Sequence, residues 1–266
     1  MAIKRVLLSV LGESNYLSLL SRTYQALYRT GLLGKEYEDV YFLKKIIRPG
    51  DYCADIGAHL GYFTIELSRL VGTNGKVFAV EPINLFHRVL QRLLQRKKAR
   101  NVSLYQLALG GKGDYVEMGI PQVGTERKFA HARIKENNEH LQFVRSEKVK
   151  NEPGDRLFLQ LPRLDYIKCD VEGFEYEVFA SMLQTLEVHH PMLLCELFDR
   201  GLLIRFSELL QPLGYRAYSL EKEMLLPADV YAEGQIPPDN YYFLPPQRED
   251  RFLRFVRPPG TGTLDR

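Results

Sequence analysis

The sequence predicts an α/β fold in which a mostly parallel, doubly wound sheet of seven strands carries helices on both faces. Short apolar runs alternate with amphipathic helical patterns along most of the chain, and this alternation is typical of parallel sheets. A strand, a glycine turn and a helix also follow one another directly in residues 52–64. Acidic residues end several of the expected strands. Ligands of such sheets bind beyond the carboxyl ends of the strands, so these acids are candidates for a site.

The 266 residues divide into three expected regions. Residues 1–48 form an N-terminal helical extension, residues 49–247 the main domain, and residues 248–266 a basic tail. A single core rarely grows beyond about 250–300 residues, so one large domain with extensions is expected instead of two full domains. Within the main domain, residues 115–150 lose the strand and helix pattern. We interpret them as a variable insertion that selects the substrate and holds one extra strand at 116–121.

The seven strands are expected where apolar runs are bounded by turn residues. The first begins at Tyr52, and the others cover Gly75–Pro82, Val102–Leu109, Tyr166–Gly173, Met192–Leu197, Tyr215–Leu220 and Asn240–Leu244. Helices are expected before the first strand, with a break at Gly31–Gly34, and between the strands at 85–97, 174–187 and 203–210.

Composition excludes several classes of protein. An apolar share of 45% and a net charge of +3 are those of an ordinary globule, and that charge is too small to predict a nucleic-acid partner. No apolar run is long enough for a membrane-spanning helix, and residues 1–12 are expected to be a mature helix and not a signal peptide. Three cysteines within apolar runs indicate a reducing compartment, so a cytoplasmic location is expected. A weak peripheral membrane contact stays open for the basic tail, as does the role of the stripe Arg88, Arg92 and Arg96.

The stretch after the first strand is suited to holding a ligand. Gly57 and Gly61 allow a tight turn, and the helix that follows presents unpaired N–H groups. The spacing differs from the Gly-x-Gly-x-x-Gly pattern of nicotinamide sites, and Asp55 precedes the first glycine. A carboxylate there repels a pyrophosphate but attracts an ammonium group. S-adenosylmethionine has the matching charges.

A second acid supports the same ligand. Glu81 ends the second strand and follows Gly57 by 24 positions, near the roughly 20-residue offset at which such carboxylates meet ribose hydroxyls. The end of the third strand, at Leu107 and Ala108, is expected beside an adenine ring.

Three blocks of the chain resemble the FkbM family of S-adenosylmethionine-dependent methyltransferases. They are Asp55–Thr64, Glu81-Pro82 and Ile167–Glu175, and the last, with its Asp-Val-Glu-Gly-x-Glu pattern, is the most specific. The resemblance implies the Rossmann-like fold of class I methyltransferases. It also implies cofactor contacts at Asp55, Gly57, Ala58, His59, Gly61, Tyr62, Thr64, Glu81, Pro82, Leu107 and Ala108. His59 departs from the asparagine usual in the family, which leaves the role of its side chain open.

The substrate side is expected at the later strands. Asp170, Glu172 and Glu196 are the candidate catalytic residues, with Asp170 preferred as the base that takes the proton from the acceptor. The resemblance places Asp170, Glu172 and possibly Glu175 toward the substrate. Asp170 and Glu196 suit a magnesium-type ion, but no third ligand can be identified, so no metal site is predicted.

The expected activity is methyl transfer to the hydroxyl of a small molecule or glycan, such as a sugar, a lipid-linked sugar or a secondary metabolite. Two alternatives stay open. A nicotinamide-dependent oxidoreductase is disfavoured by the missing middle glycine, and a non-catalytic nucleotide-binding scaffold by the full set of acids.

Overall fold

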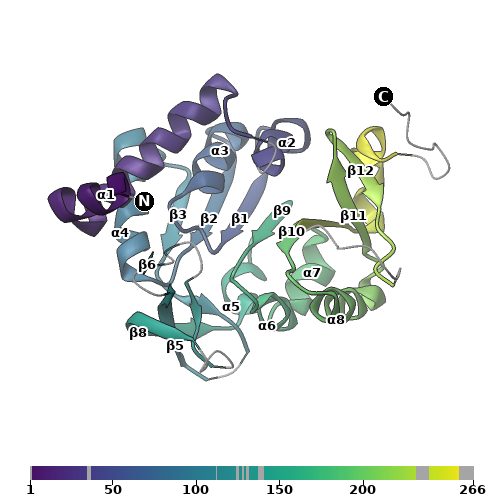
Figure 1. Cartoon of the computed structure of the whole chain (residues 1–266). Coiled ribbons are helices and arrows are strands. Elements are labelled where there is room, and N and C mark those ends of the chain that lie inside the picture. The colour runs from purple at the N-terminus through teal and green to yellow at the C-terminus, as the bar shows by residue number, and fades with distance from the viewer. Residues whose placement is uncertain are drawn as a thin grey trace. The chain divides into compact units, whose positions relative to one another are not determined.

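A computed structural model describes residues 2–34, 37–111, 113–123, 126–127, 129, 132–136, 141–231 and 240–257 (Figure 1). The chain forms two compact units. Unit 1 comprises residues 1–108 and 113–151, and unit 2 comprises residues 109–112 and 152–266. The two units divide the predicted main domain, whose boundaries at 49 and 247 stay a prediction.

Unit 1 has a parallel sheet of three strands, which are β1 (Tyr52–Ile56), β2 (Lys76–Val80) and β3 (Val102–Tyr105). Helix α3 (Tyr62–Val71) links β1 to β2, and α4 (Asn84–Lys97) links β2 to β3. The last four residues of β1 and of β2 are buried. Asp55 pairs with Ala79 and Ile56 with Val80, so the two strands end at the same level.

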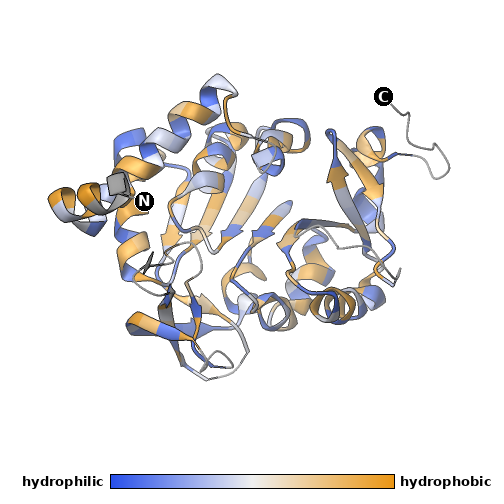
Figure 2. Ribbon diagram, in the orientation of Figure 1, coloured by the Kyte–Doolittle hydropathy of each residue, from blue (hydrophilic) through white to orange (hydrophobic). Residues whose placement is uncertain are grey.

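The N-terminal extension consists of α1 (Ala2–Thr30), which is broken at Gly12, and α2 (Glu38–Ile46). Both helices pack on unit 1, α1 against α3 and α4 and α2 against α3. Figure 2 shows hydrophobic and hydrophilic residues alternating along α1, as expected for a helix with one buried face. None of the helices in the described ranges is both long and apolar enough to cross a membrane. Arg92, from the predicted basic stripe, donates to Ser14 Oγ at 2.8 Å and joins α4 to α1.

The insertion forms more strands than the one predicted. Its elements are β5 (Tyr115–Val123), β6 (Glu126–Arg127), β7 (Arg133–Ile134) and β8 (Gln142–Glu152), preceded by β4 (Ala108–Leu109). Strands β5 and β8 are antiparallel, with Tyr115 opposite Lys150. The prediction of a single extra strand is wrong. Strand β8 is mostly exposed, so it lacks the apolar pattern by which a strand is recognised in a sequence. Pairing with β5, and not an apolar pattern, stabilises it. The expected strand 102–109 is likewise divided into β3 and β4.

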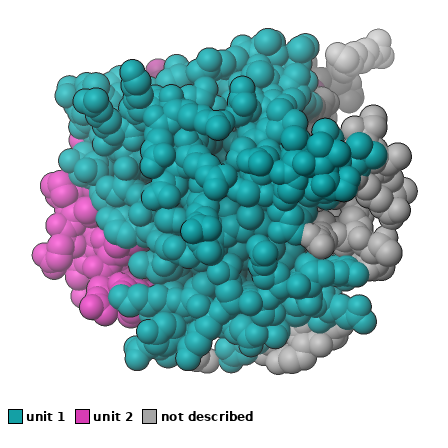
Figure 3. Space-filling view, turned by 90° about the vertical axis from the view of Figure 1, so that its left-hand side faces the viewer, with its two compact units in different colours: residues 1–108, 113–151 teal, residues 109–112, 152–266 magenta. Residues whose placement is uncertain are grey.

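Unit 2, magenta in Figure 3, holds the later strands. Strands β9 (Tyr166–Cys169) and β10 (Met192–Glu196) are parallel. Beyond β10 the strands are antiparallel, in the order β13 (Asn240–Leu244), β11 (Arg216–Glu221) and β12 (Met224–Pro227). Strand β12 adds one strand to the seven predicted. It forms a hairpin with β11 across Lys222 and Glu223, both of which have positive φ, a turn that the sequence did not indicate.

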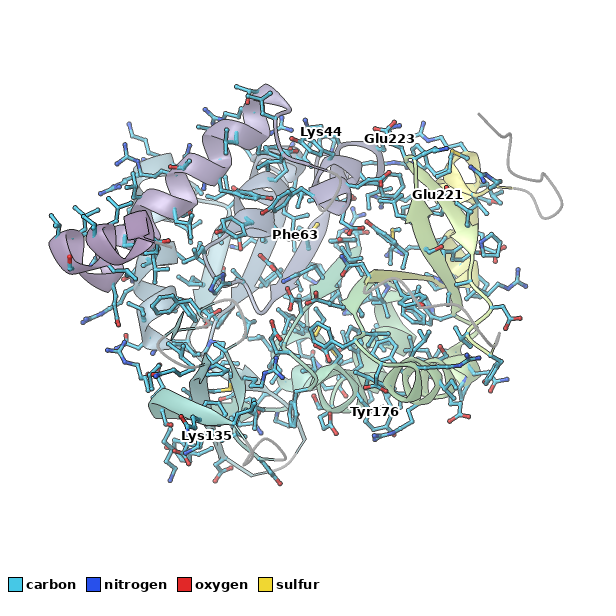
Figure 4. All side chains as sticks on the ribbon, in the orientation of Figure 1. Lys44, Phe63, Lys135, Tyr176, Glu221 and Glu223 are labelled. Carbon is cyan, nitrogen blue, oxygen red and sulfur yellow. The ribbon has the colours of Figure 1, made fainter. Side chains whose placement is uncertain are left out.

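The helices of unit 2 differ from the prediction in two ways, because one expected helix is divided and short helices occur outside the expected ranges. The expected helix 174–187 is divided at Ser181-Met182 into α6 (Glu175–Ala180) and α7 (Leu183–His189). The others are α5 (Gly154–Phe158), α8 (Arg200–Leu210), α9 (Glu249–Phe252) and the 3-10 turns η3 (Gln211–Leu213), η4 (Pro246–Arg248) and η5 (Leu253–Phe255). The guanidinium of Arg205 in α8 lies 4.4 Å from the ring centre of Tyr176 in α6, which Figure 4 labels.

The described part of the basic tail is packed into unit 2. Arg248 Nη1 donates to Asp165 Oδ1 at 2.7 Å, and its Nη2 donates to the carbonyl oxygens of Leu164 and His189. Phe252 is buried, and Val256 pairs with Leu225. These residues therefore anchor the tail. Residues 258–266 and the pair Pro237-Pro238 lie outside the described residues.

Candidate active site

The turn after β1 is built in the left-handed region of backbone conformation. Gly57, His59 and Gly61 have φ values of 75°, 46° and 81°. The N–H groups of Gly57 and Ala58 both donate to the carbonyl oxygen of Val80, at 3.0 Å each. The turn is thereby fixed to the end of β2, as the sequence predicted for a strand, a glycine turn and a helix. Gly61 then begins α3 as its N-terminal cap.

Asp55 lies inside this turn. Its side chain is fully buried, and its Oδ2 accepts a hydrogen bond of 2.5 Å from the hydroxyl of Thr64, which is also fully buried. Asp55 lies in the last part of β1 and Thr64 in the first turn of α3. Because a buried carboxylate needs polar partners, this contact fixes the geometry of the turn from within. Direct cofactor contact by Asp55 and Thr64 stays a prediction.

Gly61 also permits close packing of two helices. A Cβ atom at this position would lie 2.5 Å from Leu90 Cδ1 and 3.3 Å from Leu93 Cδ2, both in α4. Contacts shorter than 3 Å are not tolerated without movement. Gly61 is therefore favoured by its positive φ, and a side chain there would have to displace the end of the Leu90 side chain.

Glu81 connects the two loops at the ends of β1 and β2. Its Oε2 accepts from the backbone N–H of His59 and its Oε1 from that of Ile83, both at 2.8 Å. The residue is 4% exposed. Since a carboxylate oxygen can accept more than one hydrogen bond, these backbone contacts orient Glu81 and are compatible with a hydroxyl donor. Pro82 follows it and is buried.

Aromatic rings surround the turn. The ring of Tyr62 lies 3.9 Å, centre to centre, from Tyr24 of α1, and the His59 imidazole lies 4.3 Å from Phe86 of α4 in an edge contact. Tyr24 was missed by sequence reasoning, because no local signal connects α1 to a turn nearly forty residues later. The side chain of His59, which stands where asparagine is usual in the family, therefore packs against α4. Leu107 and Ala108 are buried.

The predicted catalytic acids come together in unit 2. One carboxylate oxygen from each of Asp170, Glu172 and Glu196 lies within 4.8 Å of the others, and all three residues are half-buried. Asp170 directly follows β9, and Glu196 ends β10. Glu172 adopts φ 59°, which is uncommon for a residue with a side chain. Glu172 thus places a third carboxylate beside Asp170 and Glu196, a neighbour that sequence reasoning did not identify.

The electrostatics of this acid cluster, Asp170, Glu172 and Glu196, are unusual. Burial raises the pKa of Glu196 to about 9, and the charge of Asp170, a hydrogen bond with Asp170 and the charge of Glu172 contribute to the increase. Lys168 opposes this effect: its Nζ lies 3.2 Å from Asp170 Oδ2, and its side chain is almost fully buried. The acid cluster therefore binds a proton more tightly than an isolated carboxylate does, beside the Lys168–Asp170 ion pair.

The side chain of Glu175 is bound to the backbone of the loop that precedes α6. It is fully buried, and it accepts hydrogen bonds from the N–H groups of Val171 (2.9 Å) and Gly173 (3.1 and 3.3 Å). Burial raises its pKa to about 7, although the same backbone donors lower it. The suggestion that Glu175 faces the substrate is therefore wrong. Glu175 instead holds the loop that carries Glu172.

Comparison with known proteins identifies the family. The sequence profile of the methyltransferase FkbM domain matches residues 55–217, more than half of the chain. The chain belongs to the FkbM methyltransferase family. The match includes both the turn after β1 and the acid cluster, so the resemblance predicted from three blocks is confirmed. S-adenosylmethionine is the cofactor of this family, and the fold is the Rossmann-like α/β fold of class I methyltransferases.

Solved structures with a similar fold are distant in sequence. The FkbM methyltransferase from Methylobacillus flagellatus is 15% identical, with a TM-score of 0.47, covering 77% of this chain and 50% of that one. A SAM-dependent O-methyltransferase from Thermotoga maritima is 15% identical, with a TM-score of 0.45, covering 78% and 64%. A precorrin-6y C5,15-methyltransferase from Geobacter metallireducens is 16% identical, with a TM-score of 0.44, covering 79% and 85%. The chain thus spans less than two thirds of the Methylobacillus and Thermotoga proteins. No curated protein matches it in sequence.

The residues of unit 1 fit the methyl donor. Glu81 is a buried acceptor held in place by two backbone donors, as a ribose diol requires. The turn at Gly57–Gly61 has positive φ at three residues, as a backbone turn close to a ligand would need. Leu107 and Ala108 are apolar and almost fully buried, which is compatible with an adenine ring beside them.

Proposed function

We propose that this FkbM protein is an O-methyltransferase that modifies the hydroxyl of a small molecule or glycan, such as a sugar, a lipid-linked sugar or a secondary metabolite. The observation that carries the proposal is the acid cluster of Asp170, Glu172 and Glu196. A hydroxyl is a weak nucleophile that must lose its proton during methyl transfer, and positioned carboxylates supply the acceptor for that proton. The family match removes support from the nicotinamide alternative.

The reaction is an in-line displacement. Bound S-adenosylmethionine supplies an electrophilic methyl group on a sulfonium. The acceptor oxygen forms the new C–O bond as the C–S bond breaks, the electron pair stays on sulfur, and the hydroxyl proton moves to a carboxylate. We assign the proton acceptor to Asp170, which Lys168 holds in an ion pair 3.2 Å away. Glu196, whose pKa burial raises to about 9, shares a hydrogen bond with Asp170 and positions it.

In unit 1 the proposed cofactor contacts are Asp55, Gly57, Ala58, His59, Gly61, Tyr62, Thr64, Glu81, Pro82, Leu107 and Ala108. Glu81 has the strongest support, because a buried acid whose orientation two backbone N–H groups fix is suited to a ribose diol. A cytoplasmic location fits the three cysteines, Cys53, Cys169 and Cys195, which are free and buried.

The test is transfer of labelled methyl groups from S-adenosylmethionine to fractionated cell glycans, lipids and small metabolites. We expect label that survives mild base, since an O-methyl ether resists this treatment whereas a methyl ester does not. Base-labile label would show a carboxyl acceptor instead. Label in no fraction, with S-adenosylhomocysteine bound, would support the non-catalytic alternative.

A further inference from the structure

We propose that unit 1 has a second binding site, for a compact anion carrying two or more phosphate charges, in a basic cavity at the amino ends of its strands. The open cavity has a volume of about 600 Å³ and is lined by Arg29, Arg69, Lys76, Lys97, Lys98 and Arg100. We call it the basic cavity. This inference does not depend on the methyl acceptor or on the acid cluster.

The basic cavity is separate from the proposed cofactor site. Lys76 begins β2, and Asn101 directly precedes β3, so the cavity lies where the strands start. Glu81 and the turn at Gly57–Gly61 follow the ends of the strands. A ligand in the basic cavity would therefore lie at the amino ends of the unit 1 strands, whereas the proposed site for the methyl donor lies at their carboxyl ends.

Most cations of the basic cavity have no acid beside them. Arg69 pairs with Glu66 at 2.5 Å. Within the described part of the chain, Arg29, Lys76, Lys97, Lys98 and Arg100 make no ion pair, and no acid lines the cavity. The pKa of Lys97 is lowered, first by burial and then by the charges of Arg29 and Arg22. Like charges thus lie close enough to repel one another, a cost that a bound anion would relieve.

The partial negative charges of helix C-termini neutralise only part of the positive charge of the basic cavity. Three helices, α1, α3 and α4, end beside the cavity, at Thr30, Val71 and Lys97. Each helix C-terminus carries about half a negative charge. Together they offset about one and a half of the positive charges. Lys98 caps α4, but Lys76 and Arg100 lie outside these helices, so stabilisation of helix ends does not explain all of the charge.

The cavity wall is held in place. Asn101 Nδ2 donates to the carbonyl oxygens of Ser68 and Gly72, both at 2.8 Å, and its Oδ1 accepts from Ser68 Oγ at 2.6 Å. Lys98 ends α4 in the left-handed conformation (φ 53°, ψ 39°), a position where glycine or asparagine is preferred. A lysine there keeps a cation at the cavity at a cost in backbone energy.

The size favours a small ligand over a nucleic acid. A volume of about 600 Å³ lies within the range of small-molecule sites, roughly 300–1,000 Å³. Clustered cations in a concave site match a diphosphate or a phosphorylated headgroup, because several charges meet on one compact group. The same chemistry occurs on free phosphate compounds and on lipid headgroups, and the experiment separates the two.

The test measures inorganic pyrophosphate binding by calorimetry at constant ionic strength. We expect one site per chain. Lys98→Gly removes a charge and suits the backbone conformation, so it should keep the fold while weakening pyrophosphate binding by about two- to fivefold, the range for an exposed charge. Lys97→Gln combined with Lys98→Gly should weaken it about tenfold. Arg88→Gln, which replaces a cation of the same helix outside the cavity, is the matched control and should change nothing.

Three outcomes would overturn the proposal: no pyrophosphate binding, an equal loss in Arg88→Gln, or tight oligonucleotide binding that pyrophosphate does not displace. Co-sedimentation with phosphatidylcholine vesicles, with and without phosphatidic acid, distinguishes the source. Binding to the phosphatidic acid vesicles that Lys98→Gly weakens supports a lipid headgroup, and pyrophosphate binding alone supports a free ligand. S-adenosylhomocysteine affinity should stay unchanged in Lys98→Gly. Failure of the basic-cavity proposal can therefore be distinguished from failure of the methyltransferase proposal.

Discussion

Thr64 donates its hydroxyl hydrogen to Asp55 at 2.5 Å, and neither side chain is accessible to solvent. The pair joins the end of β1 to the first turn of α3. The shape of the proposed cofactor site therefore depends on a contact beneath its surface.

Replacing Thr64 by Val should remove this donor at nearly constant volume. We expect the free energy of unfolding to fall by about 1.5–3 kcal/mol, the range for a hydrogen bond to a charged group. Urea unfolding followed by circular dichroism measures the loss. Thr64→Ser keeps the hydroxyl and is the matched control. A loss in Thr64→Ser as large as that in Thr64→Val would contradict a dominant role of the hydrogen bond.

Gly61→Ala should destabilise unit 1 strongly. Its Cβ would meet Leu90 Cδ1 at 2.5 Å in a position with φ 81°, so strain from overpacking, about 1–3 kcal/mol, adds to a left-handed penalty of about 1–2 kcal/mol. Gly31→Ala is the control, because Gly31 also has positive φ (73°), at the end of α1, but a Cβ added there would have no atom within 4 Å. Thermal denaturation of the two variants should separate packing from backbone strain. Equal melting temperatures would contradict the close approach of α4.

Glu81→Ala should weaken S-adenosylhomocysteine binding by about 1.5–3 kcal/mol, or roughly 10- to 150-fold, because a charged acceptor for the ribose is lost. Calorimetry measures the affinity. Circular dichroism of the same sample checks that the loops that Glu81 joins, at His59 and Ile83, are still folded. An unchanged affinity would remove Glu81 from the cofactor site.

Asp170→Asn should keep the shape of the acid cluster but abolish its proton acceptor. We expect methyl transfer to fall by about 10²- to 10⁴-fold, with S-adenosylhomocysteine affinity within about tenfold of the original. Glu208→Gln, which replaces an acid of α8 outside the cluster, serves as the control and should retain full activity. If Asp170→Asn retains turnover, the base is another residue of the cluster. If the loss follows cofactor affinity alone, Asp170 belongs to the cofactor site.

The stability of the protein should decrease as pH rises. The pKa values of Glu196 and Glu175 are raised in the folded state, to about 9 and about 7, whereas in the unfolded chain both are near about 4.3. The folded state therefore binds more protons. The stabilisation is complete below about pH 4.3 and is lost as pH rises through about 7 for Glu175 and through about 9 for Glu196. Urea unfolding between about pH 5 and about pH 9 checks this trend. Glu196→Gln should flatten its upper part, and an unchanged slope would contradict the raised pKa.

The sequence alone was sufficient to predict where the buried strands lie. Strands β1 and β2 were predicted within about two residues, because buried parallel strands are short apolar runs between turn residues. The acids at strand ends were found by the same reasoning, since the ends of such strands define where ligands bind.

Other features depend on contacts distant in the chain. Strand β8 is polar and exposed, so no local pattern indicates it. The family resemblance implied a possible substrate-side position for Glu175, but the backbone N–H groups of Val171 and Gly173 fix it inside the loop. Tyr24 reaches Tyr62 only after α1 has packed on the sheet helices. Tertiary packing decides each of these positions.

The insertion begins and ends at adjacent points. The N–H of Asn151 donates to the carbonyl oxygen of Asp114 at 2.8 Å, and Tyr115 lies opposite Lys150. The two ends of the insertion are thus joined as the two strands of a hairpin are, and this pairing does not depend on the length of the insertion. Exchanging it for a shorter or longer segment would change the entropy of loop closure by only about 0.6 kcal/mol for each doubling of length. The segment can therefore be exchanged as a unit, with strands β1, β2 and β3 left as they are.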